Sequence, residues 1–216
     1  MIRPGDTIVI VGDSWGCGEW GFVDGTYNVT HLGLEEYLVD YGCKVYNLSK
    51  GGASNRYSIN QLFKFLKLLN PDIIFWFQTD SMRDLRPYNK SSFPQTVADL
   101  IKCQHGLIKK TYEQLNSLGV KIHCIGGTVK LSPTITNYPN LISCIDSVIE
   151  FFGGTSPEFW VSDWIQCENL ISHEFLAELY TMLNTNKYLP KEWFYPDGNH
   201  PNRFAHQKIF EFILTC

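Results

Sequence analysis

The stretch TIVIVGDS, residues 7–14, decides the fold that we expect. Its first five residues, Thr7–Val11, form a short apolar run bounded by turn residues, which is typical of a parallel strand buried on both faces. Three further runs of this kind follow along the chain: Lys44–Leu48, Ile73–Phe77 and Lys121–Ile125. The sequence therefore predicts at least four buried parallel strands.

Segments with helical spacing separate these runs. In Ile59–Leu69 and in Val97–Leu118, apolar residues recur at intervals of three or four and so share one helix face. Strands that alternate with helices favour an α/β protein, a three-layer α/β/α sandwich around a central, mostly parallel sheet.

The last third of the chain is less regular. We predict one helix near Leu141–Phe152, a fifth strand at Phe159–Val161, and helices at Leu170–Leu183 and Phe204–Leu214. No repeat, low-complexity tract or linker divides the sequence, so residues 1–216 are expected to form a single domain.

Composition narrows the function classes. The net charge of −4 argues against binding nucleic acid, because contacts with a phosphate backbone need clustered Lys and Arg. The sequence has no signal-like segment and no run of about 18 apolar residues, so we expect no membrane span and a cytoplasmic location. Seven scattered cysteines without a CxxC pair are typical of reduced, mostly buried thiols, and no metal-like spacing indicates a metal site.

A candidate nucleophile, Ser14, lies directly after the first strand. In open α/β sheets, ligands bind beyond the carboxyl ends of the strands, where this serine is expected. A serine hydroxyl becomes an effective nucleophile when a neighbouring base takes its proton. The plainer interpretation of Gly12-Asp13-Ser14 is a strand-to-loop turn with a capping serine.

A candidate base, His200, lies in the segment Asp197–Pro201, just before the last predicted helix. Among the six histidines, it alone has a carboxylate three residues upstream in an evident turn. That spacing lets Asp197 accept a hydrogen bond from one ring nitrogen and leaves the other nitrogen to act as base. The alternative is a simple turn that leads into a helix.

A glycine-containing loop, Ser49–Asn55, follows the second strand. Its glycines allow a backbone N–H to approach a substrate oxygen closely, as an oxyanion hole requires. One alternative is a plain strand-to-helix loop with Ser54 or Asn55 as the N-cap. Another is a nucleotide-binding loop, although this segment lacks the Walker spacing.

Together, these blocks resemble the SGNH (GDSL-type) hydrolase superfamily in order and spacing. Gly12-Asp13-Ser14 resembles its nucleophile block, Gly52-Ala53-Ser54 its glycine block, and Asp197-x-x-His200-Pro201 its base block. The resemblance implies a flavodoxin-like fold and a serine esterase without metal or organic cofactor. In that enzyme Ser14 attacks the ester, His200 is the base and Asp197 orients it. The Gly-Asp-Ser-Trp-Gly form also resembles bacteriophage-encoded members, which would fit association with a virion.

The fourth family block departs from the pattern. The family has Gly-x-Asn-Asp after the third strand, whereas this chain reads Phe77-Gln78-Thr79-Asp80. The resemblance implies that the backbone N–H groups of Ser14 and Gly52 form the oxyanion hole, with Thr79 or Gln78 in place of the family asparagine. Loss of one such donor typically costs roughly 100- to 1,000-fold in turnover, so the strength of the activity is open. Substrate contacts are expected from Asp13, Trp15 and Asp80.

The expected substrate is a small-molecule or glycan ester, with an acetyl or other short acyl group. Aromatic residues near the blocks, such as Trp20 and Tyr195, would stack on a sugar ring or, on the plainer interpretation, fill the core. A thioesterase or lysophospholipase is an alternative activity. A non-catalytic SGNH-like module that binds glycan or serves in an assembly is an alternative of another class, favoured by the altered fourth block. The oligomeric state is left open.

Overall fold

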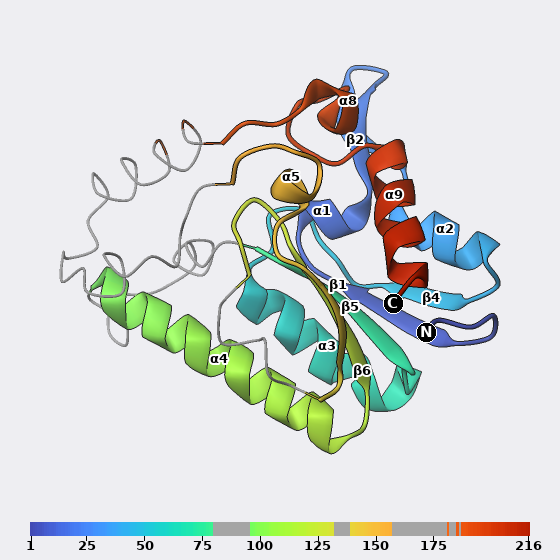
Figure 1. The fold of residues 1–216 in the computed structure, drawn as a ribbon, viewed down its shortest axis with the longest axis vertical. Helices are drawn as coiled ribbons and strands as arrows, with labels where there is room; N and C mark the ends of the chain where they lie inside the picture. Colours follow the sequence, from blue (N-terminus) through green and yellow to red (C-terminus); the bar gives the residue numbers. More distant parts are fainter. Residues whose placement is uncertain (80–95, 132–138, 157–180, 182–184, 186) are drawn as a thin grey trace.

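The structure, a computed structural model, describes residues 1–79, 96–131, 139–156, 181, 185 and 187–216 (Figure 1). Its central sheet has five parallel strands in the order β4-β1-β5-β6-β7. Counted along the chain, this is the order 2-1-3-4-5 of flavodoxin-like folds. The bounds are β1 (Thr7–Val11), β4 (Lys44–Asn47), β5 (Ile73–Gln78), β6 (Lys121–Gly126) and β7 (Leu141–Ile145). The predicted α/β fold with a parallel sheet is thus confirmed.

Strand β1 lies between two neighbours, with Ile8 opposite Val45 of β4 and opposite Ile73 of β5. Successive side chains enter different hydrophobic clusters: Ile8 on one face of the sheet and Val9 on the other. Because both faces are covered, every residue of the strand except the first is buried, which explains its continuous apolar sequence.

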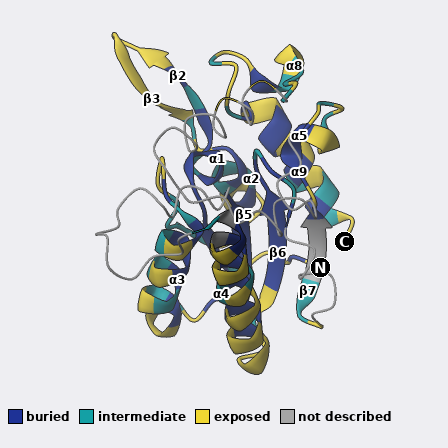
Figure 2. Ribbon diagram, turned by 90° about the vertical axis from the view of Figure 1, so that its left-hand side faces the viewer, coloured by how far each residue is buried: buried dark blue, intermediate teal, exposed yellow. Residues whose placement is uncertain are grey.

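Helices cover both faces of the sheet (Figure 1). On one face lie α3 (Asn55–Leu69) and α4 (Val97–Ser117), whose inward residues pack in one cluster with Val9. On the other face lie α2 (Leu34–Asp40) and α9 (Arg203–Leu214), with the short helices α5 (Val148–Phe151) and α8 (Lys191–Phe194) at its end. The outer surfaces of α3 and α4 are exposed, as Figure 2 shows. None of the described helices combines the length and the apolar character needed to span a bilayer.

Residues 12–43, where we predicted no element, hold α1 (Ser14–Cys17), α2 and a β-hairpin, β2 (Glu19–Val23) and β3 (Thr26–His31). The turn Asp24-Gly25 has φ angles of 50° and 75°, as a two-residue turn between twisted strands requires. At Gly18, with φ 119°, a Cβ atom would lie 2.2 Å from the His31 carbonyl oxygen, so a residue without a side chain lets the hairpin start here.

The helix predicted at Leu141–Phe152 is wrong. Its first part is the strand β7, and only Val148–Phe151 are helical. Parallel pairing with β6 decides this, because the pairing is a tertiary contact that local apolar spacing does not report. The helix predicted at Phe204–Leu214 is confirmed as α9, whereas Phe159–Val161 and nearly all of Leu170–Leu183 lie outside the described residues.

Candidate active site

The candidate nucleophile begins α1, directly beyond the carboxyl end of β1. Asp13 caps this helix, since its Oδ1 accepts a hydrogen bond from the Trp15 N–H at 2.9 Å. At Gly12 a Cβ atom would lie 2.6 Å from the Cβ of Phe77, so only glycine lets the loop pass this close to β5. Ser14 is thereby held just beyond the carboxyl end of β1, with 7% of its surface exposed.

The candidate base reaches this serine from the far end of the chain. His200 lies in the loop between α8 and α9, and its Nε2 is 2.8 Å from Ser14 Oγ. Its Nδ1 is 2.5 Å from Oδ2 of Asp197. With a proton on Nδ1 donated to the carboxylate, Nε2 is left as the acceptor for the serine hydroxyl. The fold therefore brings together Ser14, His200 and Asp197 in the order that nucleophilic catalysis needs.

The Asp197 carboxylate is surrounded by donors. Its Oδ1 accepts the backbone N–H groups of Asn199 at 2.9 Å and of His200 at 3.0 Å, and its Oδ2 faces His200 Nδ1 and accepts the hydroxyl of Tyr27. Burial by itself raises the pKa of Asp197, but these hydrogen bonds outweigh it and hold the pKa below its ordinary value. The side chain, 4% exposed, therefore remains an anion beside the imidazole.

The hairpin supplies two site residues that the sequence analysis did not assign to these contacts. Trp20 of β2 donates its Nε1–H to the Ser14 carbonyl at 2.8 Å, and its ring lies 5.5 Å from the His200 ring. Tyr27 of β3 stacks on Trp20 at 5.3 Å and contacts both Asp197 and His200. The Asp24-Gly25 pair is a turn signal that could have indicated the hairpin, but nothing in the sequence places that hairpin against the base loop.

An ion pair between the buried Glu19 and the exposed Arg203 anchors the hairpin. Glu19, at the start of β2, accepts hydrogen bonds from three donor groups of Arg203 in α9: the backbone N–H at 2.8 Å, Nε at 3.2 Å to each carboxylate oxygen, and Nη2 at 2.7 Å. Burial raises the pKa of Glu19, but the hydrogen bonds from Arg203 outweigh it, so the pKa lies below its ordinary value. The hairpin is thus bound to the helix that follows the base loop.

Glu19→Gln is expected to destabilise the fold by about 2 kcal/mol, because it removes the charge of a side chain that is only 8% exposed. Arg203 is 44% exposed and can turn to water, which keeps the cost below that of a fully buried pair. Urea unfolding followed by circular dichroism measures the difference. The matched control is Glu211→Gln, which removes an exposed Glu211–Lys208 pair on α9 and should leave the stability essentially unchanged. Equal effects of the two variants would show that Glu19 is no anchor.

The backbone groups expected as oxyanion donors differ in whether another atom already accepts their hydrogen bond. Within the residues that the structure describes, no acceptor faces the backbone N–H of Ser14 or of Gly52. The backbone N–H of Thr79 is already used, because it donates to Oδ1 of Asn55 at 3.0 Å, while the Asn55 amide donates back to the Thr79 carbonyl at 2.8 Å. Asn55 at the start of α3 therefore holds the end of β5 in place.

Three other expected site residues point elsewhere. The Gln78 amide donates to the Tyr112 hydroxyl at 3.2 Å in the core beneath α4, because strand alternation turns it away, so it offers no oxyanion donor. The Trp15 ring is 3% exposed and packs 5.7 Å from Phe194, so it lies in the core and not against substrate. Asp13, at 3% exposure, serves as a helix cap. Asp80 lies outside the described residues.

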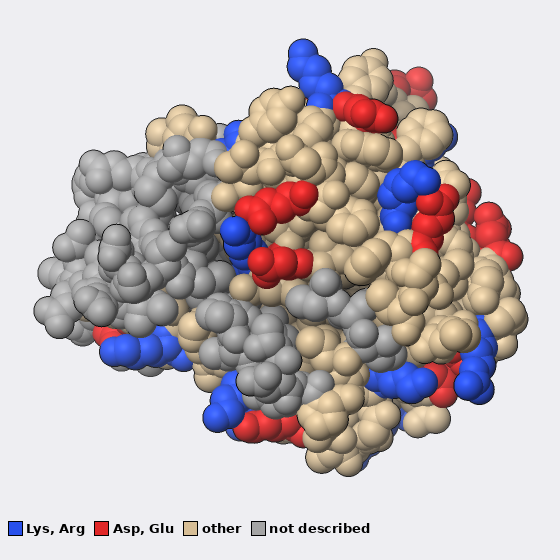
Figure 3. Space-filling model, viewed as in Figure 1, with Lys and Arg blue, Asp and Glu red and all other residues tan. Residues whose placement is uncertain are grey.

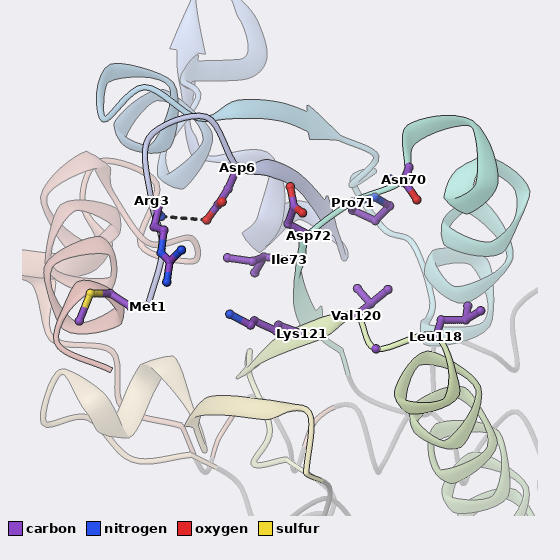
Figure 4. Close-up of a pocket in the computed structure, with 11 residues that line it drawn as sticks. Met1, Arg3, Asp6, Asn70, Pro71, Asp72, Ile73, Leu118, Val120 and Lys121 are labelled. Carbon is purple, nitrogen blue, oxygen red and sulfur yellow. Dashed lines mark hydrogen bonds between the residues drawn. The ribbon is translucent and has the colours of Figure 1, made fainter.

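A separate cavity of about 430 Å³ lies at the opposite, amino end of the strands (Figure 4). Of its two carboxylates, Asp6 accepts the Arg3 N–H and Asp72 accepts the Thr7 N–H, each at 2.8 Å. Its described lining holds no serine, cysteine or histidine. Elsewhere, in the part of the chain that is described, no three His, Cys, Asp or Glu side chains could hold a metal ion. On the face in Figure 3, acidic and basic side chains are interspersed.

No protein-family model and no curated protein matches this sequence. Several solved structures are similar in fold. A psychrotrophic esterase, EstA, from Pseudoalteromonas sp. is 12% identical with a TM-score of 0.48, over 97% of this chain and 95% of that one. TesA is 16% identical with a TM-score of 0.47, over 96% of each chain. An acetylxylan esterase from Geobacillus stearothermophilus is 13% identical with a TM-score of 0.46, over 99% of this chain and 94% of that one. Similarity at this level does not carry the activity of those proteins over to this chain.

Proposed function

We propose that this chain is a serine esterase of the SGNH (GDSL) type that hydrolyses a short-chain ester through an acyl-enzyme intermediate. The observation that carries the proposal is the contact of 2.8 Å between Ser14 Oγ and His200 Nε2, with Asp197 on the other ring nitrogen. A nucleophile, a base and a group that orients the base are the minimum machinery of this chemistry.

The proposed reaction has two halves. Ser14 Oγ attacks the carbonyl carbon while His200 Nε2 takes the hydroxyl proton, and the tetrahedral oxyanion lies against the N–H groups of Ser14 and Gly52. Collapse of this intermediate breaks the ester bond, and the alcohol leaves with the proton from Nε2. Water then attacks the acyl carbon while His200 Nε2 takes a proton from it. The bond from that carbon to Ser14 Oγ breaks, the acyl group leaves as the free acid, and Nε2 returns the proton to Ser14 Oγ.

The hairpin offers a surface for the alcohol part of the substrate. Trp20 pairs with Val29 and Phe22 pairs with Tyr27, so the side chains of these four residues share one face. Ring contacts lead outward from His200, through Trp20 and Tyr27 to Phe22, which is 77% exposed. Figure 2 shows this hairpin projecting beyond the end of the sheet that carries α1. Such a face suits the apolar side of a sugar ring, which favours a carbohydrate ester as substrate.

A short acyl group, such as acetyl, fits the sequence, which has no long apolar segment of the kind that forms a lipase lid. A thioester or lysophospholipid substrate needs the same nucleophile and differs in the leaving group. The location proposed is cytoplasmic, or virion-associated for a chain encoded by a bacteriophage.

Labelling with a fluorophosphonate tests the proposal. We expect one label per chain, found on Ser14 by peptide mass spectrometry, because only an activated serine attacks phosphorus at a useful rate. Ser14→Ala should take up no label. An unlabelled wild-type protein that also leaves p-nitrophenyl acetate intact would refute the proposal.

A second candidate is a non-catalytic module that binds glycan, favoured by Thr79 where an oxyanion asparagine is expected. It predicts that an acetylated oligosaccharide binds and is recovered with its acetyl groups, and that Ser14 stays unlabelled. Stoichiometric labelling of Ser14 would count against it.

A further inference from the structure

The hydroxyl of Tyr27 lies inside the contact between the base and its carboxylate. It donates a hydrogen bond to Oδ2 of Asp197, the same oxygen that lies 2.5 Å from His200 Nδ1, and it is 3.0 Å from that nitrogen. A phenol, an imidazole and a carboxylate therefore meet at one oxygen atom. Since Asp197 is an anion, the single phenol proton points to the carboxylate.

Tyr27 is held in this position from two sides. Its ring lies 5.3 Å from Trp20 and 5.2 Å from Phe22, and the hairpin that carries it is tied to α9 through Glu19. Burial, together with the hydrogen bond and the charge of Asp197, raises the pKa of Tyr27 well above its ordinary value. The hydroxyl therefore stays protonated at acidic and neutral pH and remains a hydrogen-bond donor.

We propose that Tyr27 is a positioning residue that sets how strongly Asp197 stabilises positive charge on His200. The inference rests on the proposed function, in which His200 must be unprotonated to act as base. A carboxylate oxygen that accepts a second strong hydrogen bond offers less negative charge to the first donor. The phenol thus weakens the stabilisation of the imidazolium and keeps His200 competent at lower pH, while it fixes the rotation of the carboxylate.

Other titratable groups around this end of the hairpin are already partnered or buried. Glu19 and Arg203 form their own pair, His31 lies 3.4 Å from Glu36, and burial lowers the pKa of His206 to about 4. Among the residues that the structure describes, the groups with a direct polar contact to the His200 ring are Ser14, Asp197 and Tyr27. Tyr27 is therefore the group through which the balance between base and carboxylate can be changed without replacing either of them.

Tyr27→Phe tests this role because it keeps the ring and removes only the hydroxyl. In the pH profile of kcat/KM for p-nitrophenyl acetate, we expect the acid limb to shift to higher pH by about 0.5 to 1 pH unit. On the alkaline plateau, kcat should fall by about 3- to 10-fold with little change in KM. Tyr37→Phe is the matched control, since the hydroxyl that it removes bonds the Arg203 carbonyl at 3.0 Å, away from the three residues. Its acid limb should coincide with that of the wild type.

Placing 3-fluorotyrosine at position 27 of the otherwise unchanged chain gives a second test with the opposite sign. Its more acidic phenol donates a stronger hydrogen bond, so the acid limb of the kcat/KM profile should shift to lower pH. This test also decides the matter if Tyr27→Phe does not fold. An acid limb that stays in place in the fluorinated protein would overturn the proposal.

Titration of the His200 ring by NMR separates this inference from the proposed function, because it needs no turnover. If the wild type hydrolyses esters but neither variant at position 27 changes the pH at which the ring signal titrates, the role of Tyr27 is refuted and the esterase stands. If no ester is hydrolysed but the ring titrates at higher pH in Tyr27→Phe, the role of Tyr27 is supported while the esterase fails.

Discussion

Ser14→Ala is expected to lower kcat for p-nitrophenyl acetate by roughly 10⁴- to 10⁶-fold, the largest effect of any single substitution in this chain. Alanine has no hydroxyl to attack the carbonyl, and His200 Nε2, 2.8 Å from the serine oxygen, then has no proton to take. Any residual rate would come from substrate binding and from the oxyanion donors, which remain. Initial rates with purified proteins measure the effect.

Ser117→Ala is the control for this substitution. It removes an equal hydroxyl, which bonds the Gln114 carbonyl at the exposed end of α4, and it should leave kcat unchanged. Equal rates for wild type and Ser14→Ala would mean that Ser14 is not the nucleophile.

Asp197→Asn should lower kcat by roughly 10³- to 10⁴-fold with KM nearly unchanged. The carboxylate accepts from four donors: two backbone N–H groups, His200 Nδ1 and the Tyr27 hydroxyl. An amide must turn its NH₂ group toward some of these donors, so His200 loses its partner or adopts the other tautomer, with a proton on the nitrogen that faces Ser14. The control is Asp72→Asn, whose carboxylate accepts the Thr7 N–H at the amino end of the sheet. A wild-type rate in Asp197→Asn would show that the carboxylate does not orient the base.

The same variant should change the acid stability of the fold. Because the folded-state pKa of Asp197 is lowered, its charge contributes stability that is complete above the unfolded-state pKa and is lost as pH falls through the folded value. The unfolding free energy of the wild type should therefore fall more steeply than that of Asp197→Asn between about pH 5 and pH 3. Urea titrations at each pH measure the two slopes, and parallel slopes would contradict this account.

Several features of the site could be predicted from the chain alone. Buried parallel strands are continuous apolar runs, so β1 and β5 could be recognised in the sequence. Their carboxyl ends indicated the end of the sheet at which Ser14 lies. The pairing of Asp197 with His200 is local, because three residues of a turn separate them. Order and spacing selected Ser14, Asp197 and His200, and the structure places their side chains in contact.

The direction of side chains around the site could not be predicted in the same way. Trp15 is adjacent to the nucleophile in sequence, yet its ring enters the core, because α1 turns it toward Phe194. Thr79, in place of the family asparagine, has its backbone N–H taken by Asn55, a contact between β5 and the start of α3. Sequence neighbours share a loop, but which of them face the substrate depends on packing.

Local chemistry is enough to specify an element when the signal lies within that element. The apolar run of β1, the Asp24-Gly25 turn and the Asp197–His200 spacing are all of this kind. The contacts that assemble the site, in contrast, join residues that are far apart in the sequence. Ser14 meets His200 across 186 positions, Tyr27 meets Asp197 across 170, and Glu19 meets Arg203 across 184. Such contacts depend on how the hairpin and α9 pack on the sheet, and residues so far apart carry no local signal of each other.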